Sequence, residues 1–295
     1  MQRWMVENVP AWLLVMLAVV GLPVLAVSLQ WLIRRRVPSL AAGEHNEAAS
    51  FLGSVVAVVY AIIAGFMVIT LWEQYVTAGD TVQNETVSLR DVVQFSGAFG
   101  PAAQGKIRQL VVRYANSVAT VEWRSMAKGD GSPVAQNDFD QLITAIQGLN
   151  VHSPTQEEFL STMLAQVDDV GKERQQRLEL SGQNVPAILW LTVILASVVT
   201  LGFCLMFGIK SASLNYIMVA SAAILIGASL VLVLLLEYPF SGTVAVRPTP
   251  FEHVVQDLRM ASVTSTSKSG FSNPVSSSLA MRINVRRLPT TAALH

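Results

Sequence analysis

Four long apolar segments without a charged residue constrain this 295-residue chain more than any other feature. They run from Ala11 to Ile33, from Phe51 to Trp72, from Val185 to Phe207 and from Leu214 to Leu236. A bilayer core is crossed by about 20 consecutive apolar residues in a helix, because every backbone hydrogen bond must be made within the segment. The segments show none of the alternation typical of membrane barrel strands. We therefore expect four transmembrane helices.

Composition supports a membrane protein, since 52% of the residues are hydrophobic and only 14% are charged. The first segment is too long for the core of a signal peptide, and three arginines follow it at Arg34–Arg36. Within it, Gly21 and Pro23 predict a kink.

The region between the second and third spans, residues 73–184, is predicted to be helical, because no alternating strand pattern occurs in it. We expect the second span to continue to about Phe95. A second helix carries the stripe Ile107, Leu110, Val111, Tyr114, Val118 and Val121, and a third carries Phe139, Leu142, Ile143 and Ile146. A fourth starts with Ser153 as N-cap and Gln156 in a capping box, followed by the stripe Leu160, Met163, Leu164, Val167 and Leu178.

These elements predict an all-α membrane protein: four transmembrane helices in two hairpins, with a helical extramembrane domain between helices 2 and 3. The expected parts are a first hairpin (1–72), the extramembrane domain (73–184), a second hairpin (185–237), a juxtamembrane segment (238–261) and a disordered Ser/Thr-rich tail (262–295). The juxtamembrane segment is expected to hold a short helix from Phe251 to Met260.

Positive charge in the two short loops predicts the orientation. The loop from Arg34 to Ser50 carries three arginines, and the loop from Gly208 to Ser213 carries Lys210. Both loops should face the cytoplasm, which places residues 73–184 and the C-terminus outside it.

The second span carries small residues at every fourth position, a spacing that lets helices approach closely. Beyond the membrane, polar residues at spacings of three or four continue as one face of the same helix. One interpretation is a solvated helix surface. The other is that copies of this helix surround an oligomer axis, with acidic rings at the membrane edge. The candidates for the axis are Gly53, Ala57, Ala61, Gly65, Glu73, Thr77, Asp80 and Asn84, and the polar face ends with Ser88 and Asp91.

Catalytic and metal-binding patterns are weak. Glu44-His45-Asn46-Glu47 precedes the second span and is better explained by helix capping than by metal binding. Gly100–Lys106 has the spacing of a phosphate-binding loop, but Ile107 replaces the required Ser or Thr and the context predicts a turn between helices. We therefore expect no metal, no cofactor and no nucleic-acid partner, and we do not expect an enzyme.

Several short stretches together resemble the bestrophin-like family of bacterial membrane proteins, over most of residues 10–251. The main ones are His45-Asn46-Glu47, Tyr60–Phe66, Leu71-Trp72-Glu73-Gln74, Glu122-Trp123, Pro186 with Leu189-Trp190, Phe207-Gly208 and Pro239-Phe240-Ser241-Gly242. The resemblance implies a protein of the bacterial inner membrane, distantly similar to bestrophins, which are pentameric ion channels whose second helix lines the pore. Bestrophins keep the region between the second and third spans in the cytoplasm, opposite to the orientation that the arginines predict.

The leading hypothesis from the sequence is a homo-oligomeric passive ion channel, whose partners are the lipid bilayer, further copies of itself and inorganic ions. The absence of ionisable residues within the spans argues against ion-coupled transport. The alternative is a non-conducting sensor or assembly factor that binds a partner through its extramembrane domain. A membrane enzyme ranks third, with His45 and Glu73 as its only acid–base candidates.

Overall fold

The computed structural model describes residue 6 and residues 9–36, 46–206 and 211–269, and within these ranges all regular secondary structure is helical. Four of the helices are long and apolar enough to cross a membrane. They are the first span, built from α2 (Ala11–Met16), a π-helical turn η1 (Leu17–Gly21) and α3 (Leu22–Arg36), then α5 (Asn46–Phe95), α10 (Ala187–Met206) and α11 (Ala212–Leu236). The predicted all-helical membrane fold is confirmed.

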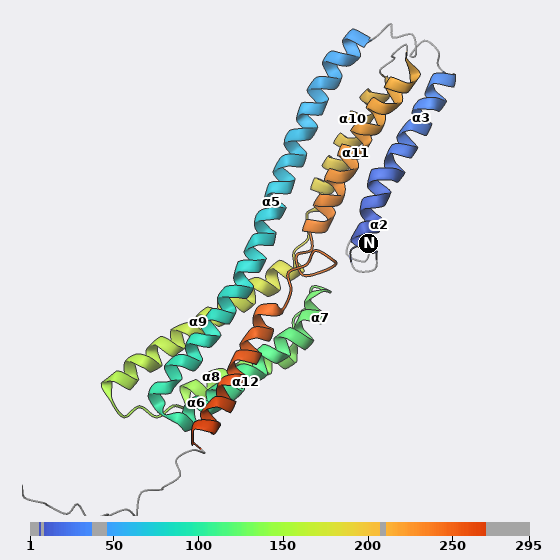
Figure 1. Ribbon diagram of the computed structural model, residues 1–295. Coiled ribbons are helices and arrows are strands. Elements are labelled where there is room, and N and C mark those ends of the chain that lie inside the picture. Colours follow the sequence, from blue (N-terminus) through green and yellow to red (C-terminus); the bar gives the residue numbers. More distant parts are fainter. Residues whose placement is uncertain (1–5, 7–8, 37–45, 207–210, 270–295) are drawn as a thin grey trace, which may run out of the picture.

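The four spans lie side by side, and α10, α11 and the first span extend from the same end of the extramembrane helices (Figure 1). The main packing partners come from different predicted hairpins, since α3 packs against α11 and α5 packs against α10. At Gly227 on α11, an added Cβ would lie 2.8 Å from the carbonyl oxygen of Ala18. Glycine is therefore required where α11 touches the π-helical turn of the first span.

The sequence predicts a kink near Gly21 and Pro23. At this place the first span contains the π-helical turn, which ends at Gly21, immediately before α3. Proline has no N–H to donate to the preceding turn, and widening the turn by one residue is one way a helix adjusts to such a residue.

Helix α5 is a single element of 50 residues, which at about 1.5 Å per residue is about two and a half times the length needed to cross a bilayer core. Its second half forms the centre of the extramembrane domain and ends at Phe95, where the sequence predicted it to end. The short 3-10 turn η2 (Ser96–Phe99) follows, and Gly100, at φ 90°, is the N-cap of the next helix. The turn predicted in place of a phosphate-binding loop is thus observed.

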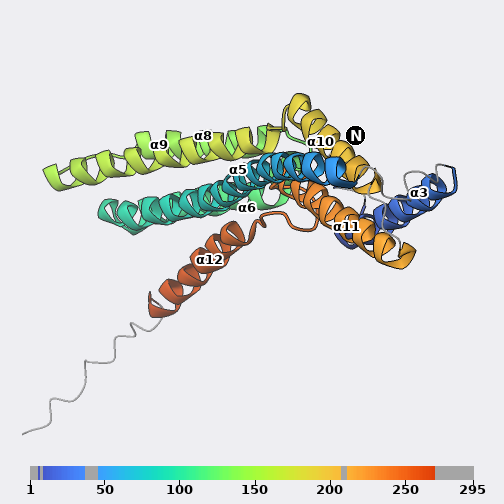
Figure 2. The same cartoon turned by 90° about the horizontal axis from the view of Figure 1, so that it is seen from above.

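The extramembrane domain adds α6 (Pro101–Ser117), a π-helical turn η3 (Val118–Glu122), α7 (Trp123–Met126), α8 (Pro133–Gln147) and α9 (Pro154–Gly182). Seen from above, α5 and α6 lie between α9 on one side and the C-terminal helix α12 (Thr249–Ser269) on the other (Figure 2). Ser153 caps α9 as predicted, since its Oγ accepts from the N–H of Gln156. The Gln156 side chain accepts from His152, one residue earlier than in a standard capping box.

Helix α12 corrects one prediction, because it continues to Ser269 instead of ending at Met260. The run after Met260 is polar, but it contains neither Gly nor Pro before Gly270, so nothing in it stops a helix. The first eight residues of the predicted disordered tail are therefore helical, and the remainder, 270–295, lies outside the described residues. Phe251 and Val254 of α12 are buried in the core of the extramembrane domain.

Candidate functional site

The small residues of α5 form a ridge, here called the α5 ridge (Gly53, Ala57, Ala61 and Gly65), that the described residues leave at least partly uncovered. Ala57 and Ala61 are exposed, Gly53 and Gly65 are half-buried, and no atom lies within 4 Å of a Cβ placed at Gly65. Small side chains at this spacing leave the backbone open to close approach. Within one chain, the ridge is an unused packing surface.

The polar residues predicted beyond the ridge face outward from the extramembrane domain. Glu73, Asp80 and Asn84 are exposed, and Thr77 is half-buried and donates a hydrogen bond to the carbonyl of Glu73 at 2.8 Å. Asn84 lies 3.4 Å from a carboxylate oxygen of Glu173. His45 lies outside the described residues, and α5 begins at Asn46, followed by Glu47.

Two stretches of the family resemblance, the one that contains Trp72 and Pro239-Phe240-Ser241-Gly242, lie where the apolar helices meet the extramembrane helices. Trp72 is 56% exposed and stacks on Tyr75, with ring centroids 5.9 Å apart. The Tyr75 hydroxyl donates to the carbonyl of Val244 at 2.9 Å. Such aromatic residues are typical of the membrane–water boundary, so we expect the membrane edge to cross α5 at this pair.

Pro239-Phe240-Ser241-Gly242 joins the end of α11 to the extramembrane core. Phe240 is buried with its ring edge against Trp123, at 5.6 Å between centroids and 84° between planes. The Ser241 hydroxyl donates to the carbonyl of Ala127 at 2.8 Å. Two stretches of the family resemblance, Glu122-Trp123 and this motif, are thus in contact in the fold.

Glu237 fixes the start of α10 against the end of α11. Its carboxylate accepts from the backbone N–H of Val185 at 3.1 Å and from Nε1 of Trp190 at 3.1 Å. Glu237 is only 3% exposed. A buried carboxylate needs such donors, and a negative charge is favourable beside a helix N-terminus.

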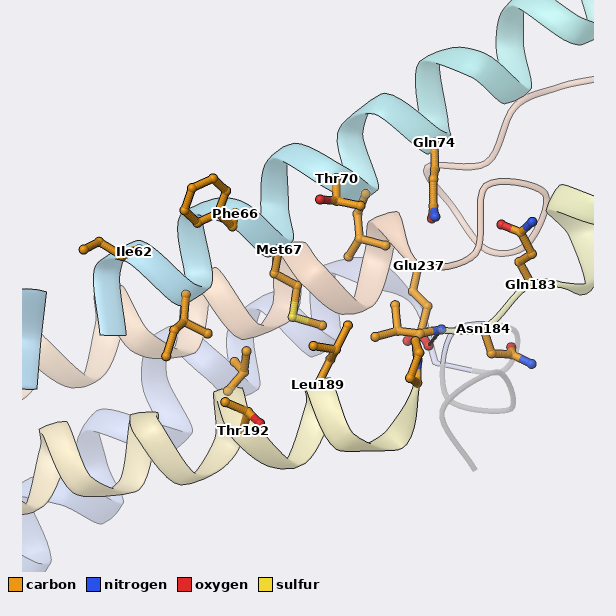
Figure 3. A pocket seen from close by; sticks show the side chains of 15 residues that line it. Ile62, Phe66, Met67, Thr70, Gln74, Gln183, Asn184, Leu189, Thr192 and Glu237 are labelled. Atoms are coloured by element: carbon orange, nitrogen blue, oxygen red, sulfur yellow. Dashed lines mark hydrogen bonds between the residues drawn. The ribbon is translucent and has the colours of Figure 1, made fainter. Parts of the chain in front are cut away.

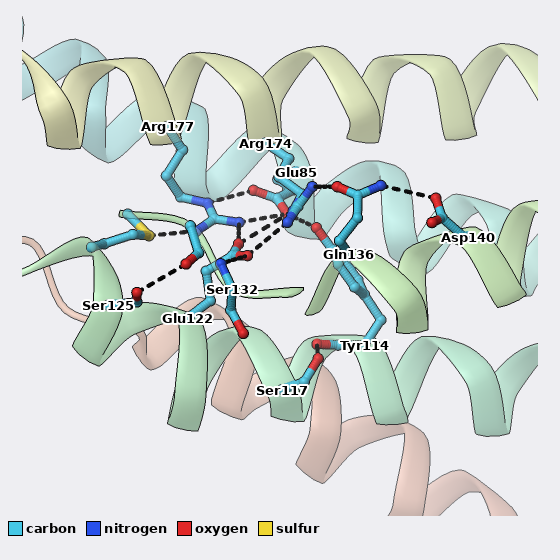
Figure 4. Close-up of polar contacts among 12 residues, drawn as sticks. Glu85, Tyr114, Ser117, Glu122, Ser125, Ser132, Gln136, Asp140, Arg174 and Arg177 are labelled. Carbon is cyan, nitrogen blue, oxygen red and sulfur yellow. Dashed lines mark hydrogen bonds and ion pairs between the residues drawn. The ribbon is translucent and has the colours of Figure 1, made fainter. Parts of the chain in front are cut away.

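A network of buried ionic side chains, here called the ionic core, joins α5 to α9 and η3 in the extramembrane domain (Figure 4). Arg177 donates from Nε to Glu85 at 2.8 Å and from Nη2 to Glu122 at 2.9 Å. Arg174 donates from Nη2 to Glu122 at 2.7 Å and from Nη1 to Gln136. The two arginines balance the two glutamates, so the ionic core has no formal net charge.

The remaining contacts of the ionic core satisfy nearly every polar group. The Tyr114 hydroxyl donates to Glu85 at 2.5 Å, and the backbone N–H of Ser132 donates to Glu122 at 3.2 Å. The guanidinium of Arg177 lies 5.4 Å from the Phe251 ring centroid, within the range of a cation–π contact. Arg177, Glu85 and Glu122 are fully buried, so each depends on these partners to remain charged.

Burial and charge pairing shift the pKa values of these groups. Burial alone would raise the pKa of Glu122, but hydrogen bonds from Arg174 and the charge of Arg177 lower it below its ordinary value. Burial, then the neighbouring Glu85 carboxylate, raises the pKa of Tyr114 well above its ordinary value. The pKa of Arg177 is raised because Glu85, Tyr114 and Glu122 together outweigh the effect of burial.

These shifts predict a stability maximum between acid and alkaline limits. The stability that Glu122 contributes is present above its unfolded-state pKa and is lost as pH falls through its lower folded-state pKa. The contribution of Tyr114 to stability has the opposite pH dependence. It is present below the unfolded-state pKa of about 10 and is lost as pH rises from there through the higher folded-state pKa. Thermal unfolding in detergent from pH 3 to 11 should show both limits. Glu122→Gln should be less stable at neutral pH and show a weaker loss in acid, whereas an equal acid loss would contradict the assignment.

The ionic core was not predicted from the sequence, because local helix geometry and burial differ from the predicted stripes at the residues concerned. The helical stripe on α6 predicted Val121 as buried, but the π-helical turn η3 shifts the register, so Val121 is 44% exposed and Glu122 faces the core. On α9, the inward face continues past Val170 to Arg174 and Arg177, and Leu164 is 38% exposed instead. The spacing Met163, Val167, Val170, Arg174, Arg177 and Ser181 is a signal that finds both arginines.

Comparisons with known proteins agree with this architecture. A model of the Bestrophin-like domain matches residues 20–251. A crystal structure described as a membrane protein aligns with a TM-score of 0.62 and 14% identity, covering 80% of this chain and 97% of that one. A bacterial bestrophin homologue from Klebsiella pneumoniae, crystallised as a variant, aligns with a TM-score of 0.61 and 15% identity, covering 84% and 99%.

No curated protein sequence was found to match the chain. At such low identities the aligned crystal structures establish a shared fold only. The family match covers the first span from residue 20 onward, α5, the extramembrane domain, α10, α11 and the start of α12. It includes the ionic core, Trp72 and Pro239-Phe240-Ser241-Gly242. The chain is therefore an integral membrane protein that belongs to the bestrophin-like family.

Proposed function

We propose that this protein is a homo-oligomeric passive ion channel, in which copies of α5 surround the conduction path. The observation that carries the proposal is the uncovered α5 ridge, which continues along one rigid helix into the exposed acidic residues Glu73 and Asp80. The family match and the shared fold with a bacterial bestrophin homologue support it.

The geometry of the α5 ridge suits crossing helices. Each step of four residues turns by about 40° beyond a full helical turn, so the ridge is inclined to the helix axis. Copies of α5 that cross at an angle keep such a ridge toward a common axis, as in close-packed small-residue pairs. Glu73 and Asp80 would then form acidic rings just beyond the membrane edge marked by Trp72 and Tyr75, where they would attract cations.

The ionic core has a supporting part in this proposal. It holds α5 at Glu85, only five residues beyond Asp80, against α9 and η3. Because every charged partner is buried, the extension of α5 is fixed in rotation and tilt. The acidic residues therefore have a defined direction relative to the spans, as a selectivity element requires.

Reconstitution tests the proposal directly. Liposomes with purified protein should show ion flux above empty liposomes, and crosslinking in membranes should give a discrete homo-oligomer. Gly65→Trp should lower the flux by about tenfold or more, because the indole would fill the space beside the ridge. Leu195→Trp is the matched control, since Leu195 is 59% exposed on α10. A monomer without flux, crosslinked instead to a different protein, would favour the alternative of a non-conducting partner-binding protein.

We further infer that residues 73–184 and the C-terminal segment are extracytoplasmic in a bacterial inner membrane. The four arginine and lysine residues of the short loops support this orientation. Burial of Phe251 from α12 in the extramembrane core supports the same side of the membrane for α12 and that domain.

Cysteine labelling tests the orientation in a Cys204→Ser background. Thr155→Cys on α9 and Ser211→Cys beside α11 are both exposed positions. An impermeant thiol reagent should label intact cells at position 155 and not at 211. Labelling at 211 alone would give the orientation of bestrophins instead.

A further inference from the structure

A groove between α5 and α10 lies next to the membrane edge and has a volume of about 650 Å³. Its walls are apolar side chains of the two spans, among them Ile63, Met67 and Leu71 of α5 and Leu189 and Val193 of α10. This volume lies within the range of about 300–1,000 Å³ occupied by ligand pockets.

One end of the groove is polar. Gln74, Gln183 and Asn184 lie at this end together with Glu237, whereas Ile62 and Phe66 lie at the opposite, apolar end (Figure 3). The polar end is at the level of Trp72 and Tyr75, which mark the membrane edge. The groove is thus apolar at hydrocarbon depth and hydrogen-bonding at headgroup depth, which is the pattern of an amphiphile.

The charge of the groove indicates which headgroup a bound amphiphile would carry. Of the described residues that line it, Glu237 alone is charged, and the other polar residues at that end are neutral amides. The Glu237 carboxylate is held in place by Val185 and Trp190. An ammonium headgroup is attracted by this carboxylate and by amide oxygens, whereas a headgroup with only negative charge is repelled.

A second copy of the chain fits the groove less well than a lipid. The groove residues of α5, such as Ile63 and Met67, face α10, whereas Ala57, Ala61 and Gly65 point to another flank of α5. The α5 ridge is therefore separate from this wall of the groove. In addition, an apolar groove open at hydrocarbon depth is bathed by acyl chains in any membrane.

We propose that this groove is a binding site for one zwitterionic aminophospholipid, with an acyl chain between α5 and α10 and the ammonium headgroup among Glu237 and the amides. The lipid site does not depend on ion conduction. A protein that conducts no ions could still bind this lipid, so the two proposals are tested independently.

Native mass spectrometry of the full-length protein tests the site with an equimolar mixture of phosphatidylethanolamine and phosphatidylglycerol. One phosphatidylethanolamine per chain should be retained, with about tenfold preference over phosphatidylglycerol. Thr192→Trp should abolish the retained lipid, because Thr192 lines the groove from an exposed position. Val198→Trp, 63% exposed and outside the groove lining, should retain it.

Three results would overturn the proposal. The first is equal retention of both lipids, and the second is unchanged retention in Thr192→Trp with the protein still folded by circular dichroism. The third is efficient crosslinking of Thr192→Cys to a neighbouring chain in the Cys204→Ser background, which would assign the groove to a second copy.

Discussion

Arg177→Met should destabilise the extramembrane domain by about 3–5 kcal/mol, which is the usual cost of removing one partner from a buried ion pair. The substitution keeps an unbranched side chain of similar length but leaves Glu85 without its cation and Glu122 with Arg174 alone. Both carboxylates are fully buried. We expect the thermal midpoint in detergent, followed by circular dichroism, to fall by more than about 10 °C.

The same substitution at Arg90 on α5 is the matched control. Arg90 pairs with Asp257 at 3.1 Å, but the two side chains are 38% and 57% exposed. Exposed pairs contribute about 0–1 kcal/mol, so Arg90→Met should barely change the midpoint. Equal effects of the two substitutions would mean that water reaches the ionic core.

A combined variant distinguishes the stability lost through an unpaired buried charge from the stability lost through poorer packing. Replacing both arginines by Met and both glutamates by Gln removes every charge of the ionic core at once. Buried ionic networks exchanged for uncharged side chains often lose little stability. The fourfold variant should therefore be more stable than Arg177→Met alone, and a still lower midpoint would show that packing dominates.

The membrane fold was predictable from the sequence because the bilayer imposes a length and a composition that few other structures meet. The end of α5 at Phe95 was predictable for a similar reason, since Gly97 and Gly100 interrupt the helix locally. Such signals depend on neighbouring residues and need no tertiary information.

The ionic core could not be predicted in the same way. Glu85, Glu122, Arg174 and Arg177 lie far apart in the sequence, and charged residues are rarely fully buried unless paired. The polar positions that the sequence did suggest on α5, such as Glu73 and Asp80, are exposed, while Glu85 on the opposite face is buried. Assigning a buried role to Glu85 required knowing which helices pack against that face.

Gly242→Val should open the junction between the spans and the extramembrane domain. Gly242 adopts φ 84°, where a β-branched residue is strained by about 1–3 kcal/mol. An added Cβ would also lie 2.6 Å from Cγ1 of Val6 and 3.0 Å from its carbonyl oxygen. Because Val6 is only 3% exposed, its displacement costs about 1.5–3 kcal/mol more.

The consequence reaches the extramembrane core through the neighbouring residues. Ser241 bonds to the carbonyl of Ala127, so distortion of the turn should release this loop and let trypsin cut the backbone at Lys128, whose side chain is already exposed. Cleavage there should accelerate by about tenfold or more, because local opening becomes easier by over 1.4 kcal/mol. Thr243→Val, an exposed position in the same turn, should leave the rate unchanged. If Gly242→Val is cleaved no faster than Thr243→Val, then Phe240 and Trp123 alone hold the junction, and the turn is dispensable.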